Sequence, residues 1–128
     1  MGELTSGVNF LAVIVGAVVA FVVGWAWYSP KVFGEKWAVG SGVKMDAASK
    51  MPVAAMAAQG IGLFLMSWFV GVTAASNMLA TVILATVAFA VLAYSGNTFS
   101  GKTAYARNVD AGYWIVALVI MILAQGLL

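Results

Sequence analysis

The sequence predicts an all-α, polytopic membrane protein whose four transmembrane helices form two similar hairpins, with a short interfacial helix after the first span. Of its 128 residues, 64% are hydrophobic, whereas soluble domains contain roughly 45–50%. Only 8% are charged, where about 25% is usual, and the charged positions leave three long uncharged windows. These observations exclude an ordinary soluble domain and predict one membrane domain over residues 1–128.

The uncharged windows locate the spans. A bilayer core of about 30 Å needs roughly 20 apolar residues in a helix. Residues 4–30 fit one span, whereas residues 51–101 are too long for one span and predict two, with a turn at 73–77. Residues 111–128 predict a fourth span that is barely long enough. We therefore expect spans at about 8–28, 52–72, 78–98 and 111–128.

Basic residues indicate how the spans are oriented. The loop after the first span contains Lys31, Lys36, Lys44 and Lys50, and the segment after the third contains Lys102 and Arg107. Cytoplasmic loops of membrane proteins are enriched in Lys and Arg, so both basic segments are predicted to face the cytoplasm and both termini to lie outside it. The lipid bilayer is the first expected partner.

The residue types that are missing limit the chemistry. The chain contains no His and no Cys, the usual ligands of zinc, copper, haem and iron–sulfur clusters. We therefore expect no metal and no cofactor, and we see no basic groove for nucleic acid. Catalysis would need a positioned acid, base or nucleophile. Glu35, Asp46 and Asp110 are better explained as solvated or paired groups, with Asp110 as the N-cap of the fourth helix, so no enzymatic activity is expected.

Small residues recur every four positions on two of the predicted helices. The helix-packing candidates are Ala12, Gly16, Ala20 and Gly24 on the first and Ala54, Ala58 and Gly62 on the second. Such stripes let helix backbones approach closely in lipid. They predict either packing inside the monomer or the contact of a homo-oligomer.

An aromatic segment follows the first span. Its motif residues are Trp27, Tyr28, Ser29, Pro30, Phe33, Gly34 and Trp37. Ser29 before Pro30 is typical of an N-cap with proline at the first helical position, which predicts a short helix lying flat in the membrane interface. Val32, Phe33 and Trp37 are expected on one side of it. The aromatic residues are interpreted as interfacial anchors, with an aromatic binding site as the alternative.

Polar side chains within the spans are neutral, and Gln59 is the one we single out. Proton-driven transporters and pumps generally place a titratable group at membrane depth, and none is expected here. Gln59 is interpreted as an interhelical hydrogen-bonding residue.

The chain also contains an internal repeat. Residues 28–36 and 94–102 both read Tyr-Ser-x-x-x-Phe-x-x-Lys, at the cytoplasmic ends of the first and third predicted spans. The repeat predicts two related hairpins that point the same way, with a pseudo-twofold axis along the membrane normal.

The aromatic motif also carries a resemblance. Trp27-Tyr-Ser-Pro, Phe33-Gly and Trp37, together with residues 97–102 and 111–113, resemble the small four-span bacterial membrane proteins catalogued as domain of unknown function 1761. The resemblance implies a protein of the bacterial inner (cytoplasmic) membrane and supplies no activity.

Two functional hypotheses remain open. The first is a non-catalytic scaffold or accessory subunit that associates through its small-residue helix faces, as a homo-oligomer or in a larger membrane complex. The alternative is an oligomeric transporter or channel for a small neutral or apolar solute, which the duplicated hairpins favour. The lack of ionisable residues at membrane depth favours the first.

Overall fold

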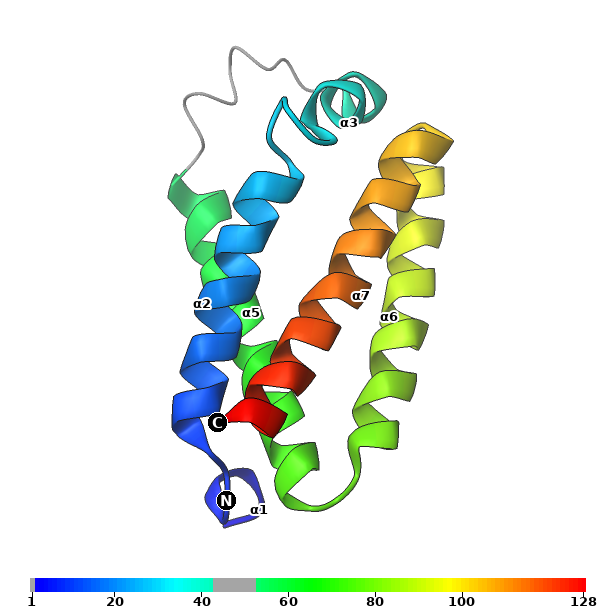
Figure 1. Ribbon diagram of the computed structural model, residues 1–128. Coiled ribbons are helices and arrows are strands. Elements are labelled where there is room, and N and C mark those ends of the chain that lie inside the picture. The colour runs from blue at the N-terminus through cyan, green and yellow to red at the C-terminus, as the bar shows by residue number, and fades with distance from the viewer. Residues whose placement is uncertain (1, 43–52) are drawn as a thin grey trace.

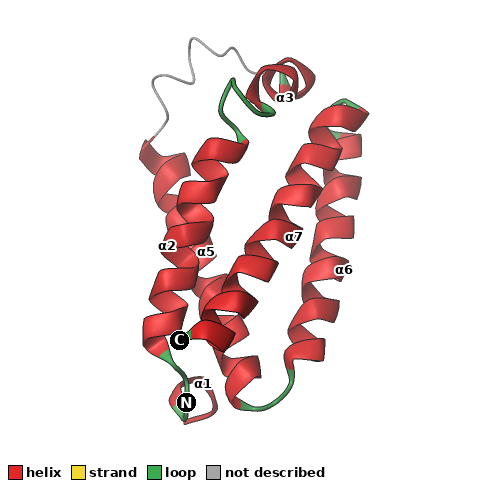
Figure 2. Ribbon diagram, viewed as in Figure 1, coloured by secondary structure: helices red, strands yellow, loops and turns green. Residues whose placement is uncertain are grey.

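The computed structural model describes residues 2–42 and 53–128, and within these ranges the regular structure is helical (Figures 1 and 2). The long helices are α2 (Phe10–Trp27), α5 (Val53–Ala75), α6 (Leu79–Phe99) and α7 (Ala104–Leu127). Each is long and apolar enough to cross a membrane. Two shorter helices are α1 (Gly2–Thr5) and α3 (Gly34–Ser41). The predicted all-α, multi-pass membrane fold with four long apolar helices in the described residues is confirmed.

The four long helices run alongside one another as two chain-adjacent pairs, α2 with α5 and α6 with α7 (Figure 1). α7 joins the pairs because it also packs against α2 and α5. The buried core lies around it, and it contains Leu63, Val70, Val82, Tyr113 and Met121. Both termini lie at one end of the bundle, and α3 lies at the other. This arrangement brings the aromatic segment that follows α2 to the start of α7.

α7 begins earlier than the sequence indicated. Thr103 is its N-cap, with a side-chain oxygen that accepts a hydrogen bond from the Ala106 amide at 3.3 Å. The predicted start at residue 111 is therefore wrong, and the helix has 24 residues instead of a barely sufficient 18. The predicted N-cap role of Asp110 is also wrong, because Thr103 caps the free amides and Asp110 lies in the second turn.

The turn between α5 and α6 is shorter than predicted. α5 continues to Ala75, so Thr73 is buried inside the helix and donates its hydroxyl to the Val70 carbonyl at 2.9 Å. The chain reverses at residues 76–78, where Asn77 adopts a positive φ of 56°. The expected features at Lys44, Asp46, Lys50 and the residue 52 helix start lie outside the described residues.

The segment after α2 is a tight corner over residues 28–33. The Ser29 carbonyl accepts from the amides of Val32 at 3.1 Å and Gly34 at 2.8 Å. α3 therefore begins at Gly34, and the prediction that Ser29 caps a helix starting at Pro30 is wrong. Gly34 is required here, since a Cβ at this position would collide with the Tyr28 carbonyl oxygen and lie 2.7 Å from the Ser29 carbonyl carbon.

Candidate functional site

The small-residue stripe of α2 is enclosed by the rest of the bundle. Ala12, Gly16, Ala20 and Gly24 are all buried. A Cβ at Gly16 would lie 2.9 Å from the Ser67 hydroxyl oxygen, and one at Gly24 would lie 2.6 Å from the Tyr113 hydroxyl oxygen. The stripe thus packs against α5 and α7 of the same chain.

The corresponding stripe of α5 behaves differently. Ala54, Ala58 and Gly62 are exposed. A Cβ at Gly62 would have no heavy atom of the described residues within 4 Å. This face is not used for packing within the described part of the monomer.

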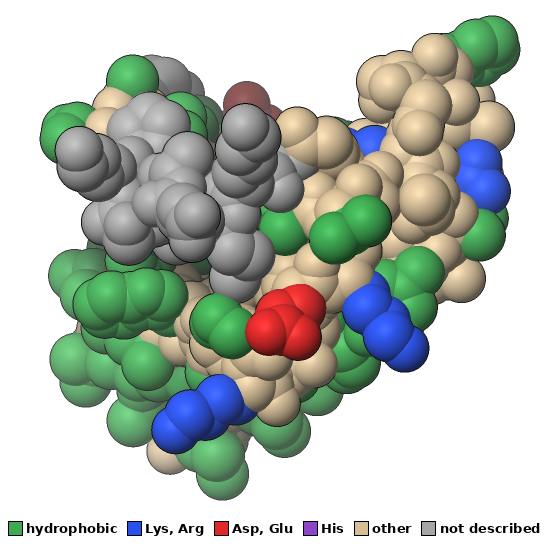
Figure 3. Space-filling view, turned by 90° about the horizontal axis from the view of Figure 1, so that it is seen from above, with side chains coloured by type: hydrophobic (Ala, Val, Ile, Leu, Met, Phe, Trp, Pro, Cys, Tyr) green, Lys and Arg blue, Asp and Glu red, His purple; other side chains and the backbone are tan. Residues whose placement is uncertain are grey.

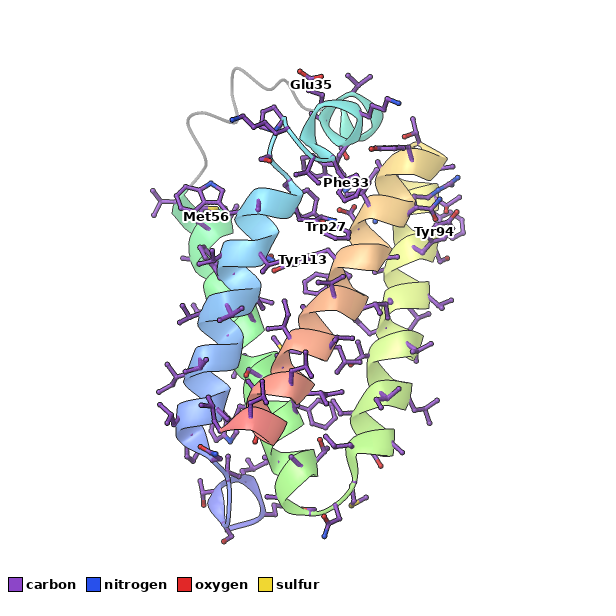
Figure 4. All side chains as sticks on the ribbon, in the orientation of Figure 1. Trp27, Phe33, Glu35, Met56, Tyr94 and Tyr113 are labelled. Carbon is purple, nitrogen blue, oxygen red and sulfur yellow. The ribbon has the colours of Figure 1, made fainter. Side chains whose placement is uncertain are left out.

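Two side chains of the core hydrogen-bond to the backbone of α2. The Tyr113 hydroxyl donates to the Ala20 carbonyl at 2.8 Å, and the Ser67 hydroxyl donates to the Val13 carbonyl at 2.7 Å. Figure 4 shows Tyr113 reaching from α7 into the space beside α2. These bonds fix α2 against both α5 and α7.

The aromatic motif packs inward onto the start of α7. The Trp27 indole donates to the Val109 carbonyl at 3.0 Å, and its ring lies 4.7 Å from the Phe33 ring, with both side chains beside α7 in Figure 4. The Tyr28 and Trp37 rings meet edge to face at 4.9 Å. Val32 does not share this side as predicted, because the corner leaves it exposed.

Asp110 is the polar centre of this region. Its Oδ1 accepts from the Tyr28 hydroxyl at 2.6 Å and the Trp37 indole at 2.9 Å. Its Oδ2 accepts from the Asn97 amide at 3.2 Å and the Lys102 ammonium at 2.9 Å. A carboxylate has about four lone-pair sites, so the described donors occupy its hydrogen-bonding capacity. The name "Asp110 centre" is used below for these five side chains.

The electrostatics of the Asp110 centre follow from its burial. The Asp110 side chain is 13% exposed and that of Lys102 is 24% exposed, so the ion pair is largely removed from water and its net charge is close to zero. Burial raises the pKa of Tyr28, and the hydrogen bond and negative charge of Asp110 raise it further. Tyr28, which follows the spanning part of α2, therefore stays a neutral donor at physiological pH.

A cavity of about 700 Å³ adjoins the Asp110 centre. The described residues that line it are Phe21, Gly24, Trp25, Tyr28, Ser29, Pro30, Trp37, Ala55, Met56, Gln59, Phe89, Ala93, Asn97, Asp110, Tyr113 and Trp114. They come from the corner, from α3 and from all four long helices. From Asn97 to Phe89 the cavity follows α6 for eight residues, or about 12 Å at 1.5 Å per residue. Trp25 and Phe89 are 66% and 52% exposed, so the cavity is open at the side of the bundle.

Charged side chains surround the same end of the bundle. Figure 3, which looks onto the α3 end, shows Lys and Arg side chains beside hydrophobic ones. Lys36 lies over the Tyr105 ring at 5.5 Å, and the Arg107 guanidinium lies over the Tyr94 ring at 5.0 Å. The described basic residues thus lie around the α3 end of the bundle and are not part of the cavity lining.

The repeated motifs have different surroundings. Tyr28 of the first copy bonds to Asp110, whereas Tyr94 of the second faces outward from α6 against Arg107 (Figure 4). Lys102 of the second copy pairs with Asp110, whereas Lys36 of the first lies over Tyr105. The two copies therefore contribute complementary parts of one site instead of two equivalent sites.

The sequence predicted most residues of the corner as a motif, but it did not predict Asp110, Asn97 and Lys102 as site residues. Gln59, predicted as an interhelical contact, lines the cavity and faces the Tyr113 hydroxyl. One signal for Asp110 was available, since it is the only acidic residue after Asp46 and it precedes a long apolar helix. Its partners Trp37 and Tyr28 could not be found, because they are 73 and 82 residues away in the chain.

Comparison with known proteins gives a family and no activity. The model of the family described as "Protein of unknown function (DUF1761)" matches residues 11–126. No curated protein and no solved structure matches the chain. The match covers nearly all of the four long helices and the whole Asp110 centre.

Proposed function

The chain belongs to the DUF1761 family of proteins of unknown function, and from this premise we propose that it is an integral membrane protein that binds a small neutral or apolar molecule in the cavity beside Asp110. The single observation that carries the proposal is the cavity itself. Its volume of about 700 Å³ lies within the range of roughly 300–1,000 Å³ typical of small-molecule sites. Mostly apolar walls with a few convergent polar groups are also typical of such sites.

The charge distribution supports a neutral ligand. Lys102 neutralises Asp110, and the hydrogen-bonding capacity of Asp110 is occupied by Tyr28, Trp37, Asn97 and Lys102. A charged ligand would lose its hydration without gaining an unpaired partner among the described lining residues. Transport or carriage of such a molecule would then need no titratable group at membrane depth.

The packing of α2 also favours binding over a purely structural role. The small-residue stripe of α2 is buried by contacts within the monomer, so it is not exposed for contact with a partner protein. The stripe of α2 therefore no longer supports the scaffold hypothesis, and the cavity is the feature that best indicates a function.

The position of the basic residues supports a location for the cavity. The described basic residues lie just before α3, within it, or around the start of α7, at the end of the bundle that carries α3; they are Lys31, Lys36, Lys102 and Arg107. By the enrichment of bases in cytoplasmic loops, this end faces the cytoplasm and both termini lie outside. On the resemblance to small four-span bacterial membrane proteins, we propose the bacterial inner membrane as its location, with the cavity between the cytoplasmic interface and the membrane interior.

Binding of naphthalene, a neutral apolar probe, tests the proposal. The protein is placed in lipid nanodiscs, and bound naphthalene is measured by equilibrium dialysis against empty nanodiscs. Ala93→Trp fills the cavity and is expected to weaken saturable binding at least tenfold. Ala88→Trp places the same side chain at an exposed α6 position outside the cavity lining and should leave binding unchanged. Equal binding by both variants and the parent would contradict the proposal.

A second candidate function rests on the exposed stripe of α5. Ala54, Ala58 and Gly62 form a smooth face that could associate with a second copy or with a larger membrane complex. Native mass spectrometry tests it, because a homo-oligomer has a mass that is an integer multiple of 13.3 kDa. Gly62→Ile should dissociate such an assembly, whereas Gly96→Ile, at another open helical glycine, should not. A monomer mass for the parent protein would reject this candidate.

A further inference from the structure

We propose that the ligand of the cavity is an uncharged molecule with a flat aromatic ring and a hydroxyl or amide group that hydrogen-bonds to Gln59. This inference rests on the proposed binding function and narrows it to a chemical class. It assigns Gln59 as the residue that selects the polar group, and the aromatic walls as the part that selects the ring.

The walls of the cavity favour a flat ring. Seven of the described lining residues are aromatic, namely Phe21, Trp25, Tyr28, Trp37, Phe89, Tyr113 and Trp114. The Phe89 and Trp114 rings lie 5.5 Å apart and nearly perpendicular at 77°, and the Tyr113 and Trp114 rings are also 5.5 Å apart. These rings contact one another, and together with the other aromatic side chains they line the cavity. An aromatic guest can stack on the faces and meet the edges, and both geometries are favourable.

Outside the Asp110 centre, the polar lining points to Gln59 as the amide with bonding capacity to spare. Among the described lining side chains within the long helices, Asp110 has its lone pairs occupied, Asn97 is held in the Asp110 centre by its amide bond to Asp110, and the Tyr113 hydroxyl donates to the Ala20 carbonyl. The indole N–H groups of Trp25 and Trp114 can only donate. Gln59 faces only the Tyr113 hydroxyl in this region, and an amide has two N–H donors and an acceptor oxygen. A ligand hydroxyl or amide at this position would complete its hydrogen bonding.

Gln59 also sits apart from the charged end of the cavity. It lies six residues into α5, about 9 Å from the first residue of that helix along its axis. The Asp110 centre is tied to the corner and to α3. The polar group of the ligand is therefore expected inside the span, with the ring between Gln59 and the aromatic walls.

The neutralised Asp110 separates this proposal from an organic-cation site. Aromatic walls can also bind quaternary ammonium groups, and a free carboxylate would strengthen such binding. Here Lys102 lies 2.9 Å from Asp110, so the carboxylate offers a cation no unpaired charge. An anion would be repelled by the Asp110 carboxylate, and the described lining contains no Lys or Arg side chain to compensate. Both charged forms should bind more weakly than a neutral one.

Four probes that share one ring system test the inference. They are naphthalene, β-naphthol, β-naphthoate and β-naphthyltrimethylammonium, each measured at pH 7 by equilibrium dialysis in nanodiscs and corrected for empty nanodiscs. A hydrogen bond contributes about 1 kcal/mol net, so β-naphthol should bind about fivefold more tightly than naphthalene. Each charged probe should bind at least tenfold more weakly than β-naphthol.

Substitution of Gln59 gives the decisive comparison. Gln59→Leu should abolish the preference for β-naphthol while leaving naphthalene binding intact, which also reports that the variant is folded. Gln125→Leu is the matched control, because Gln125 lies near the far end of α7, outside the cavity lining, and it should keep the preference.

The outcomes separate this inference from the function on which it rests. If naphthalene shows no saturable binding, the proposed function itself fails. If naphthalene binds but the ammonium probe binds most tightly, the cavity is an organic-cation site and the inference is overturned. If Gln59→Leu keeps the β-naphthol preference, the assignment of Gln59 is overturned. If the parent protein shows no preference for β-naphthol over naphthalene, the assignment is overturned whether or not the variant folds.

Discussion

The Tyr28 hydroxyl donates to Asp110 Oδ1 at 2.6 Å, and this bond joins residues 82 positions apart in the chain. It holds the corner after α2 against the second turn of α7. A backbone bond from the Thr103 amide to the Gly40 carbonyl at 3.0 Å holds α3 to the start of the same helix. The α3 end of the cavity is therefore built by contacts between the two halves of the chain.

Removal of the Asp110 carboxylate tests its structural role. Asp110→Ala leaves Tyr28, Trp37 and Lys102 without their shared acceptor. Loss of a fully buried ion pair costs about 3–5 kcal/mol, and the partial exposure of this pair reduces the expected loss of unfolding free energy to about 2–3 kcal/mol. Denaturant titration in micelles measures it. Glu35→Ala, at an exposed site on α3, is the control and should change the value by less than about 0.5 kcal/mol.

Alkaline pH should destabilise the protein through Tyr28. Its pKa is raised in the folded state, chiefly by burial, so above pH about 10 the unfolded chain releases the Tyr28 proton while the folded protein retains it. Stability from this group is complete below pH 10 and is lost as the pH rises further. Tyr28→Phe should therefore lower the thermal midpoint at pH 7 but flatten its decline between about pH 10 and 11. An equally steep decline in the variant would contradict this assignment.

Substitution of Gly24 and Gly62 tests which small-residue face packs within the monomer, that of α2 or that of α5. A Cβ at Gly24 would lie 2.6 Å from the Tyr113 hydroxyl oxygen and 2.9 Å from its ring carbon Cζ. The Tyr113 side chain, which would have to shift, is buried and is hydrogen-bonded to the Ala20 carbonyl. Gly24→Ala should destabilise the monomer by about 1–3 kcal/mol, as is usual for overpacking. Gly62→Ala has open space among the described residues and should be neutral or slightly stabilising. Equal thermal midpoints for the two variants would contradict the packing described for α2.

Reporter fusions test the orientation. A periplasmic-active phosphatase fused after Leu128 should be active, and one fused after Gly101 should be inactive, because the segment at Lys102 is predicted to be cytoplasmic. The reverse pattern would place the cavity at the outer face of the membrane.

The fold class could be predicted because it depends on composition and on the spacing of charges. The four spans follow from uncharged windows alone, and a helix is the form that satisfies its backbone within one lipid-embedded segment. The boundaries were less predictable because they depend on local capping. Thr103 starts α7 with a single side-chain bond, and the distinct apolar run begins only at Ala111.

The site could be predicted only in part. Trp27, Tyr28 and Trp37 could be predicted as one motif because they lie close together in the sequence. Their acceptors on α7 could not, because these depend on the tertiary arrangement. Ala54, Ala58 and Gly62 look like a second packing stripe in sequence, but the bundle turns that face of α5 outward. Sequence spacing defines a helix face, whereas the packing of the other helices decides what that face contacts.

Photolabelling tests the central claim, that the cavity binds a neutral aromatic molecule, most directly. The protein in nanodiscs is irradiated with azidonaphthalene, with and without excess β-naphthol, and labelled residues are mapped by mass spectrometry. Cavity residues such as Met56, Ala93 and Trp114 should be labelled and should lose the label with β-naphthol, whereas outward residues such as Leu84 should not respond. Two results would contradict the account. One is labelling of the cavity residues that does not decrease when β-naphthol is added, and the other is equal labelling of the cavity residues and of Leu84.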